Sequence, residues 1–274
     1  AIKLALMDDE ALIRRSAVES IAPTIQKEKT DIIAPLLYDP VKAVRIEAAR
    51  QLAEEPSRRL NPDQEKVFKA VLKEFVASME YSADFSFGRY NLGNLYVAMN
   101  QPKEAIRNYL AAIKVDGLFY PAKVNLAMFY NQKGENGKAE VLLREVIQDH
   151  PELSEIAYSL GLLLAEMKKY DQAAIYLEKA AKGMPKHARV HYNLGLLFQY
   201  LKRDEKAEQA LLKALEIDPN SMEYLYALAD FYLKREKFQQ SKNVTQKMVV
   251  KHPNEPIGQE LLGIIMKNLP NANQ

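Results

Sequence analysis

The sequence predicts an all-α protein, a right-handed α-solenoid built from helix-turn-helix repeats. Three observations carry this prediction: a leucine recurs every 34 residues, a small residue always follows it, and a proline or glycine ends each of the first five repeats. Internal similarity at a fixed period of this length is typical of stacked helical repeats. The recurring leucines are Leu92, Leu126, Leu160, Leu194, Leu228 and Leu262.

Each of these repeats has the pattern of two antiparallel helices. In the first helix the leucine, the small residue and an aromatic residue share one face, as Leu92, Gly93 and Tyr96 do. A second small residue, Ala105 in this repeat, lets the second helix approach closely. Proline or glycine then stops the second helix. One repeat cannot bury its apolar face alone, so we expect neighbouring repeats to stack.

The motifs of this region resemble the tetratricopeptide repeat. They read NLGNLY at 91–96, NLAMFY at 125–130, SLGLLL at 159–164, NLGLLF at 193–198 and EIDP at 216–219. The resemblance covers five repeats over residues 85–255. The large aromatic residue that the family has near the start of the first helix is missing here. Residues 256–274 follow as an expected capping helix, 256–268, and a polar tail.

Residues 1–55 carry a different and shorter repeat. LMDDEALIRRSAVESIA at 6–22 aligns with LYDPVKAVRIEAARQLA at 37–53, so that Asp39 matches Asp8 and Arg45 matches Arg14. This pair resembles HEAT-type repeats, of which the first copy is incomplete. The resemblance implies that each arginine bridges to an aspartate of the neighbouring repeat. The alternative is that both side chains are merely solvated.

Residues 56–84 are predicted to connect the two kinds of repeat, as a linker followed by an adaptor helix. The joint lies near 54–62, and Asn61 and Pro62 suit the cap and the first position of a new helix. That helix should run to about Tyr81. Phe68 and Phe75 fall where apolar residues would pack the first tetratricopeptide-like repeat against the HEAT-like part.

Composition excludes several classes of function. With 38 basic and 36 acidic side chains the net charge is only +2, which argues against a nucleic-acid partner. The absence of cysteine removes disulfides, thiolate metal sites and covalent haem attachment from this chain. No stretch approaches the ~18 apolar residues of a membrane span, so no direct membrane insertion is expected.

The sequence contains no recognisable catalytic residues, and the chain is predicted not to be an enzyme. No phosphate-binding loop, dinucleotide-binding glycine pattern or serine hydrolase motif is present. His187 and His191 are four residues apart and could share a helix face as metal ligands do. No carboxylate accompanies them in a known motif, so they are interpreted as exposed residues at a helix start, and no metal site is predicted.

The candidate site is a partner-binding groove lined by the first helix of each repeat. In the tetratricopeptide family the fifth and ninth positions of a repeat face the groove, and counting starts here at Ser86. The resemblance therefore implies a ladder of tyrosines with amide and apolar side chains between them, which suits a peptide or a helix. The alternative is that tyrosine followed by asparagine is only the common repeat consensus. The candidate residues are Tyr90, Asn94, Asn125, Met128, Tyr158, Leu162, Tyr192, Leu196, Tyr226 and Asp230.

One known use of such a groove is not expected. Tetratricopeptide co-chaperones hold a C-terminal carboxylate with a clamp of lysine and asparagine side chains. Asn94 and Asn125 match two clamp positions, but Tyr90 stands where the first lysine is needed. The basic pair of the third repeat is replaced by Glu155 and Ser159. A carboxylate clamp is therefore unsupported.

The sequence favours a protein-interaction scaffold that binds a protein or peptide in its concave groove, and two alternatives stay open. The tandem order of repeats is similar to the C-terminal part of bacterial multihaem c-type cytochrome/tetratricopeptide proteins. That resemblance implies a non-catalytic docking arm of an exported electron-transfer protein in the periplasm or cell envelope, with haem only upstream or on a partner. The start at Ala1, inside an apolar helical pattern, suggests a cut from a longer polypeptide. The second alternative is a self-association module that forms a homo-oligomer through its N-terminal face.

Overall fold

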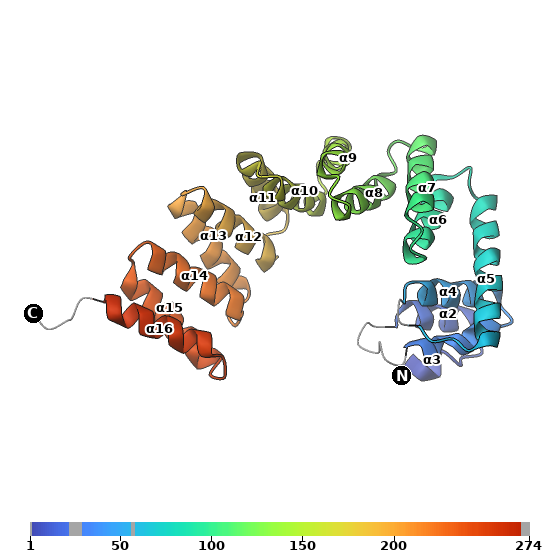
Figure 1. Cartoon of the computed structure of the whole chain (residues 1–274), viewed down its shortest axis with the longest axis horizontal. Helices are drawn as coiled ribbons and strands as arrows, with labels where there is room; N and C mark the ends of the chain where they lie inside the picture. Colours follow the sequence, from blue (N-terminus) through green and yellow to red (C-terminus); the bar gives the residue numbers. More distant parts are fainter. Residues whose placement is uncertain (1, 22–28, 56–57, 270–274) are drawn as a thin grey trace, which may run out of the picture. The chain divides into compact units, whose positions relative to one another are not determined.

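The protein is an all-α solenoid of stacked helices (Figure 1). The computed structural model describes residues 2–21, 29–55 and 58–269, and every regular element among them is helical. Contacts divide the chain into two compact parts, residues 1–126 and 127–274, which are described separately. The first tetratricopeptide-like repeat lies in the N-terminal part, together with the helices of residues 2–53. The predicted polar tail at 270–274 lies outside the described residues, as do Ala1 and residues 22–28 and 56–57.

The N-terminal part consists of short helices followed by three longer ones. The helix bounds are α1 Ile2–Ala5, α2 Ala11–Glu19, α3 Lys29–Ile33, a 3₁₀ helix Ala34–Tyr38, α4 Lys42–Ala53, α5 Pro62–Tyr81, α6 Ser86–Ala98 and α7 Pro102–Val115. Helix α8, Tyr120–Gln132, runs through the boundary between the two parts.

The C-terminal part continues the alternation of first and second helices, here called helix A and helix B of each repeat. Its helices are α9 Asn136–Asp149, α10 Ser154–Glu166, α11 Tyr170–Gly183, α12 Ala188–Tyr200, α13 Asp204–Ile217, α14 Met222–Lys234, α15 Phe238–Lys251 and α16 Pro256–Asn268. From α6 onward, even-numbered helices are A helices and odd-numbered ones are B helices.

An arginine–aspartate pair joins the two N-terminal segments that the sequence aligned, residues 6–22 and 37–53. Arg14 Nε donates to Asp39 Oδ2 at 2.7 Å and Arg14 Nη2 donates to Asp39 Oδ1 at 3.0 Å. The matching Arg45 Nη2 instead donates to Glu74 of α5 at 3.0 Å. The difference arises because α5, rather than another hairpin of the same kind, follows Arg45 in the stack.

Helix α5 is the predicted adaptor and begins where the sequence placed its cap. The Asn61 side chain accepts the backbone N–H of Gln64 at 2.8 Å, and the Gln64 side chain accepts the N–H of Asn61 at 3.0 Å. This reciprocal capping satisfies two backbone donors that a helix start otherwise leaves open. Phe68 and Phe75 are buried in the same core as Leu52 of α4. Helix α5 therefore shares the hydrophobic core of α4.

Close contact between helices A and B depends on the small residue at the eighth position of helix A. A Cβ atom added to Gly161 would lie 2.8 Å from Leu177 Cγ, and one added to Gly195 would lie 2.8 Å from Leu211 Cγ. Both distances are shorter than a real carbon–carbon contact. The glycines thus set how closely α10 approaches α11 and how closely α12 approaches α13.

Ion pairs join consecutive repeats along the B-helix side of the C-terminal part. A carboxylate on one repeat meets a cation at or near the turn of the next. The pairs are Glu140–Lys169 at 2.6 Å, Asp171–Arg203 at 2.6 Å, Asp204–Arg235 at 2.7 Å and Glu208–Lys237 at 2.6 Å. Ion pairs that are partly open to solvent, as these are, contribute only modest stability individually. Their regular placement mainly favours one register of stacking.

The turn between helices A and B contains one residue in the left-handed backbone region in every repeat. These residues are 34 apart and are Asn100, Gly134, Lys168, Lys202 and Glu236, with φ between 55° and 75°. Only one of the five is glycine, which adopts this region without steric cost. Replacing Lys202 with glycine should therefore raise the free energy of unfolding by about 0.5 kcal/mol. Gly134→Ala should lower it by about 1 kcal/mol. Urea unfolding followed by circular dichroism measures both, and a destabilised Lys202→Gly variant would contradict this explanation.

Candidate partner-binding face

The ninth position of helix A carries exposed apolar side chains on three consecutive repeats of the C-terminal part. Met128, Leu162 and Leu196 are 57%, 38% and 37% exposed. The ninth position follows the small residue that contacts helix B. One helical step rotates the side chain by ~100°, away from helix B. Together with Tyr226, 38% exposed, these residues are called the A-helix face.

Tyr158 does not project freely from this face but joins two repeats. Its hydroxyl accepts a hydrogen bond from Asn193 Nδ2 at 2.6 Å, which connects α10 to α12. The ring is half-buried, and burial raises the pKa of Tyr158. The hydroxyl therefore keeps its proton at neutral pH. Tyr158 supports the A-helix face in addition to being a candidate contact.

Tyr192 likewise contacts the next repeat. Its ring centroid lies 5.0 Å from that of Tyr224, and the Arg189 guanidinium lies over both rings. Arg189 Nη1 also pairs with Glu223 Oε1 at 2.7 Å. Burial and the charge of Glu223 raise the pKa of Tyr192 to about 12. Sequence reasoning overlooked this cluster, although Arg189 and Glu223 have opposite charges at the same repeat position.

The last candidate residue of the C-terminal part is charged and paired. Asp230 Oδ2 accepts from Lys234 Nζ at 2.7 Å, one helical turn further along α14. Asp230 holds the ninth position that is apolar in the three preceding repeats. The A-helix face therefore changes from apolar to charged at α14, next to Tyr226.

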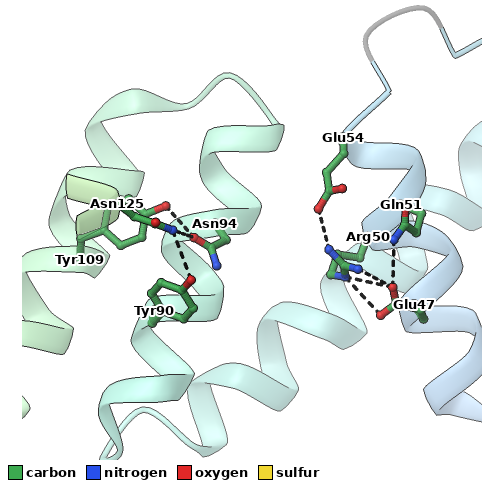
Figure 2. A network of polar contacts seen from close by, with 8 residues as sticks. All are labelled: Glu47, Arg50, Gln51, Glu54, Tyr90, Asn94, Tyr109 and Asn125. Carbon is green, nitrogen blue, oxygen red and sulfur yellow. Dashed lines mark hydrogen bonds and ion pairs between the residues drawn. The ribbon is translucent and has the colours of Figure 1, made fainter. Parts of the chain in front are cut away.

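In the N-terminal part, the candidate residues Tyr90, Asn94 and Asn125 come together in one polar cluster (Figure 2). Asn94 Oδ1 accepts from Asn125 Nδ2 at 2.8 Å and from the hydroxyl of Tyr109 at 2.7 Å. Asn125 Nδ2 also lies 3.3 Å from the Tyr90 hydroxyl oxygen. Burial raises the pKa of Tyr109 to about 12. Because both bonds are accepted by Asn94 Oδ1, they fix the orientation of the Asn94 amide and therefore the direction in which its Nδ2 points.

Asn94 also lines a cavity of about 530 Å³ whose opposite wall is α4. On α4, Arg50 Nε donates to Glu47 Oε1 at 3.1 Å and Arg50 Nη1 donates to Glu54 Oε1 at 2.6 Å (Figure 2). The hydrogen bond with Glu47 raises the pKa of Arg50. The sequence analysis did not predict that residues of α4 lie across this cavity from Asn94. The sequence feature that could have indicated this charged group is the spacing of Glu47, Arg50 and Glu54, which are three and four residues apart along one helix.

The two histidines of the pair lie at the start of α12. His187 precedes α12 and is not part of the helix, while His191 Nε2 lies 3.2 Å from the carbonyl oxygen of Pro185. Among the residues that the structure describes, no three or more His, Asp or Glu side chains are grouped to hold an ion. Within those same residues, no helix has both the length and the apolarity to cross a membrane.

Family models of the tetratricopeptide repeat match this chain in four places. The matches cover residues 90–154, 154–182, 188–221 and 210–243. They coincide with α6 to α15, the helices that carry the A-helix face and the tyrosine positions. No curated protein matches the chain.

Solved structures of similar fold come from several tetratricopeptide proteins. YrrB, described as having an unusual peptide-binding site, is 18% identical with a TM-score of 0.60, over 71% of this chain and 98% of its own. MamA from Desulfovibrio magneticus RS-1 is 20% identical with a TM-score of 0.56, over 62% and 96%. PilF of Pseudomonas aeruginosa is 19% identical with a TM-score of 0.54, over 70% and 87%. At these identities the similarity shows the fold.

Proposed function

Because this chain is a tetratricopeptide repeat protein over residues 90–243, we propose that it is a scaffold that holds a segment of a partner protein against its A-helix face. The observation that carries the proposal is the exposure of Met128, Leu162 and Leu196 at one repeat position. Single exposed apolar residues are ordinary. Three at the same position of consecutive stacked repeats offer a partner segment a series of apolar contacts. The proposal assigns the chain no catalytic step.

The surroundings of this row define the chemistry of the partner. Apolar side chains of the partner would lie on Leu162 and Leu196, while the Tyr158 and Tyr226 hydroxyls offer hydrogen bonds at the border. The change to Asp230 and its partner Lys234 gives the site a direction, with an apolar end and a charged end. An amphipathic helix or an extended peptide satisfies these conditions. The peptide-binding site named for YrrB, a protein of the same fold, is consistent with this use.

The test uses peptides selected from a random phage-displayed library on the full chain. We expect the double variant Leu162→Asp/Leu196→Asp to bind a selected peptide at least about tenfold more weakly, because two charges replace the apolar contacts. Both residues are more than a third exposed, so the substitutions should leave the fold intact. Isothermal titration calorimetry gives the dissociation constants, and circular dichroism checks the helical content.

A matched control lies on the B helices. Val141 and Ile175 are 56% and 63% exposed, so Val141→Asp/Ile175→Asp adds the same charges to apolar side chains that are more accessible than Leu162 and Leu196. This control variant should bind within about twofold of the unmodified chain. Loss of binding in the control, with the Leu162→Asp/Leu196→Asp variant unaffected, would place the peptide on the B helices and contradict the proposal.

A further inference from the structure

The side of α10 that carries Leu162 also carries two carboxylates. Glu155 precedes Leu162 by seven residues and Glu166 follows it by four, so the three lie within about 40° of one another around the helix. Both glutamates are exposed, whereas Leu160 and Gly161 on the other side of α10 are buried. With a rise of 1.5 Å per residue, Glu155 lies about 10 Å before Leu162 along the helix axis and Glu166 about 6 Å after it. Helix α10 therefore presents an apolar contact between two acidic groups.

The charges at the same positions of α12 and α14 compensate one another. Arg189 of α12 pairs with Glu223 of α14 at 2.7 Å. Within α14, Asp230 pairs with Lys234 at 2.7 Å. In the part of the chain that the structure describes, neither glutamate of α10 forms an ion pair with a lysine, an arginine or a histidine. The uncompensated negative charge on this side of the A helices therefore lies on α10.

Neutral amides hold one of these carboxylates in place. Glu166 Oε2 accepts from Asn131 Nδ2 at 3.0 Å, and Glu166 Oε1 accepts from Asn136 Nδ2 at 3.3 Å. Amides orient the carboxylate without cancelling its charge. A carboxylate has about four acceptor positions, so about two stay open to a further donor. The cation nearest in sequence, Lys168, is exposed, and among the described residues it does not pair with Glu166.

An exposed pair of tyrosines follows on the next repeat. Tyr200 is the residue of α12 equivalent to Glu166, and it is 63% exposed. Its ring centroid lies 4.4 Å from that of Tyr170, which begins α11 four residues after Glu166. The face of a tyrosine ring attracts a cation, most often a guanidinium. A carboxylate and aromatic rings at equivalent positions of consecutive repeats both favour a positively charged side chain.

We propose that the segment held on the A-helix face is basic as well as apolar, with a lysine or arginine that binds Glu166 beside the apolar side chain that covers Leu162. This inference rests on the proposed function, because it names the chemistry of the same partner. Glu155 adds attraction at the other end of α10. The separation of about 6 Å between Leu162 and Glu166 equals two residues of an extended peptide or four residues of a helix. The partner should therefore carry a basic residue two or four positions from an apolar one.

The experiment uses phage-displayed peptides that are selected on the full chain and that lose affinity for Leu162→Asp/Leu196→Asp. We expect basic residues to be enriched in these peptides at two or four positions from an apolar residue. Glu155→Gln/Glu166→Gln should bind such a peptide about three- to tenfold more weakly at low ionic strength, because two partly solvated charges are removed. Glu166→Gln alone should cause most of this loss. Isothermal titration calorimetry measures the affinities, and about 1 M salt should remove most of the difference.

A matched control lies on the B helix α13. Glu205 and Glu216 are exposed and are eleven residues apart, as Glu155 and Glu166 are. Glu205→Gln/Glu216→Gln therefore removes the same charge at the same spacing, and it should leave peptide affinity within about twofold. A peptide whose basic residue is replaced by glutamine should bind the unmodified chain and Glu155→Gln/Glu166→Gln equally. Circular dichroism should show the same helical content in all variants.

The outcomes separate this inference from the function on which it rests. Peptides that require Leu162 and Leu196 but show no enrichment of basic residues would overturn the inference and leave the scaffold function standing. Equal affinity of a basic peptide for the unmodified chain and for Glu155→Gln/Glu166→Gln would do the same. If no selected peptide loses affinity for Leu162→Asp/Leu196→Asp, the A-helix face is not the binding site, and both proposals fail.

Discussion

Replacing Gly195 with valine is expected to lower the free energy of unfolding of the C-terminal part by roughly 3 kcal/mol. The added Cβ would lie 2.8 Å from Leu211 Cγ and 3.2 Å from the backbone nitrogen of Leu211. A backbone atom cannot move aside as a flexible side chain can, so α12 and α13 would separate. Because neighbouring repeats stabilise one another, the loss should spread to α10 and α14. Urea unfolding and hydrogen exchange of these helices measure the effect.

The control for this substitution lies at the same repeat position of the last helix. Gly263→Val places an identical side chain where no atom lies within 4 Å, so its cost should stay within about 0.5 kcal/mol. The pair therefore separates overpacking from the helix propensity of valine, which is common to both variants. If Gly195→Val and Gly263→Val lowered the free energy of unfolding equally, the result would contradict the claim that Gly195 is needed for close contact between helices A and B.

Replacing Asp39 with alanine is expected to lower the melting temperature of the N-terminal part by roughly 5 °C. The Asp39 side chain is 4% exposed and accepts both from Arg14 and from the backbone N–H of Val41, at 2.8 Å. Its removal leaves the Arg14 guanidinium without a carboxylate between two hairpins. Differential scanning calorimetry measures the change, and hydrogen exchange should locate it in α2 and α4.

A control variant and the pH dependence of stability both test this role of Asp39. Asp8 is the matching residue of the first hairpin and accepts the backbone N–H of Glu10, so Asp8→Ala should have a clearly smaller effect. The hydrogen bond from Arg14 lowers the pKa of Asp39. Its stabilising contribution is therefore present above the ordinary carboxyl pKa of ~3.9 and is lost as pH falls through the lowered value. The difference between the unmodified chain and Asp39→Ala should be constant from about pH 5 to 8 and shrink below about pH 4. A difference that persists in acid would contradict the role of the ionised pair.

Much of the fold could be predicted because each repeat has the same spacing. A leucine followed by a small residue, as in Leu92 and Gly93, recurs with a period of 34, and the family models confirm tetratricopeptide repeats over that region. The cap at Asn61 was readable because capping depends on a few adjacent residues. The pairing of Arg14 with Asp39 was expected from the resemblance of two short segments to HEAT-type repeats, and the structure shows this pair.

The candidate site was less predictable because its geometry depends on contacts between repeats. Their position in the repeat made Tyr158 and Tyr192 candidate residues, but it did not show that they contact Asn193 and Tyr224 and are half-buried. The cavity beside Asn94 was missed because α4 lies outside the tetratricopeptide-like repeats, whose period of 34 was the basis for the candidate residues. The HEAT-like assignment, the groove residues and the cytochrome-linked alternative stay predictions, since spacing within one chain does not identify a partner.

The capping helix is a second case in which the sequence did not show which surfaces are covered. The sequence predicted that 256–268 would close the solenoid, and α16 does cover α15 with Leu261 and Ile265. Its opposite side keeps the pattern of Leu262, Gly263 and Met266, which in other repeats is buried under a second helix. Coverage of that pattern depends on which helix packs beside it in space, and a repeat motif does not encode this neighbour.

The central claim is that a partner segment lies on the A-helix face, and a methyl NMR titration tests it most directly. Chain labelled with ¹³C at methionine, leucine, isoleucine and valine methyl groups would be titrated with a peptide selected from the phage-displayed library. We expect the signals of Met128, Leu162 and Leu196 to shift with peptide concentration, while those of Val141 and Ile175 stay in place. Shifts confined to Val141 and Ile175, with the A-helix face unchanged, would contradict the claim.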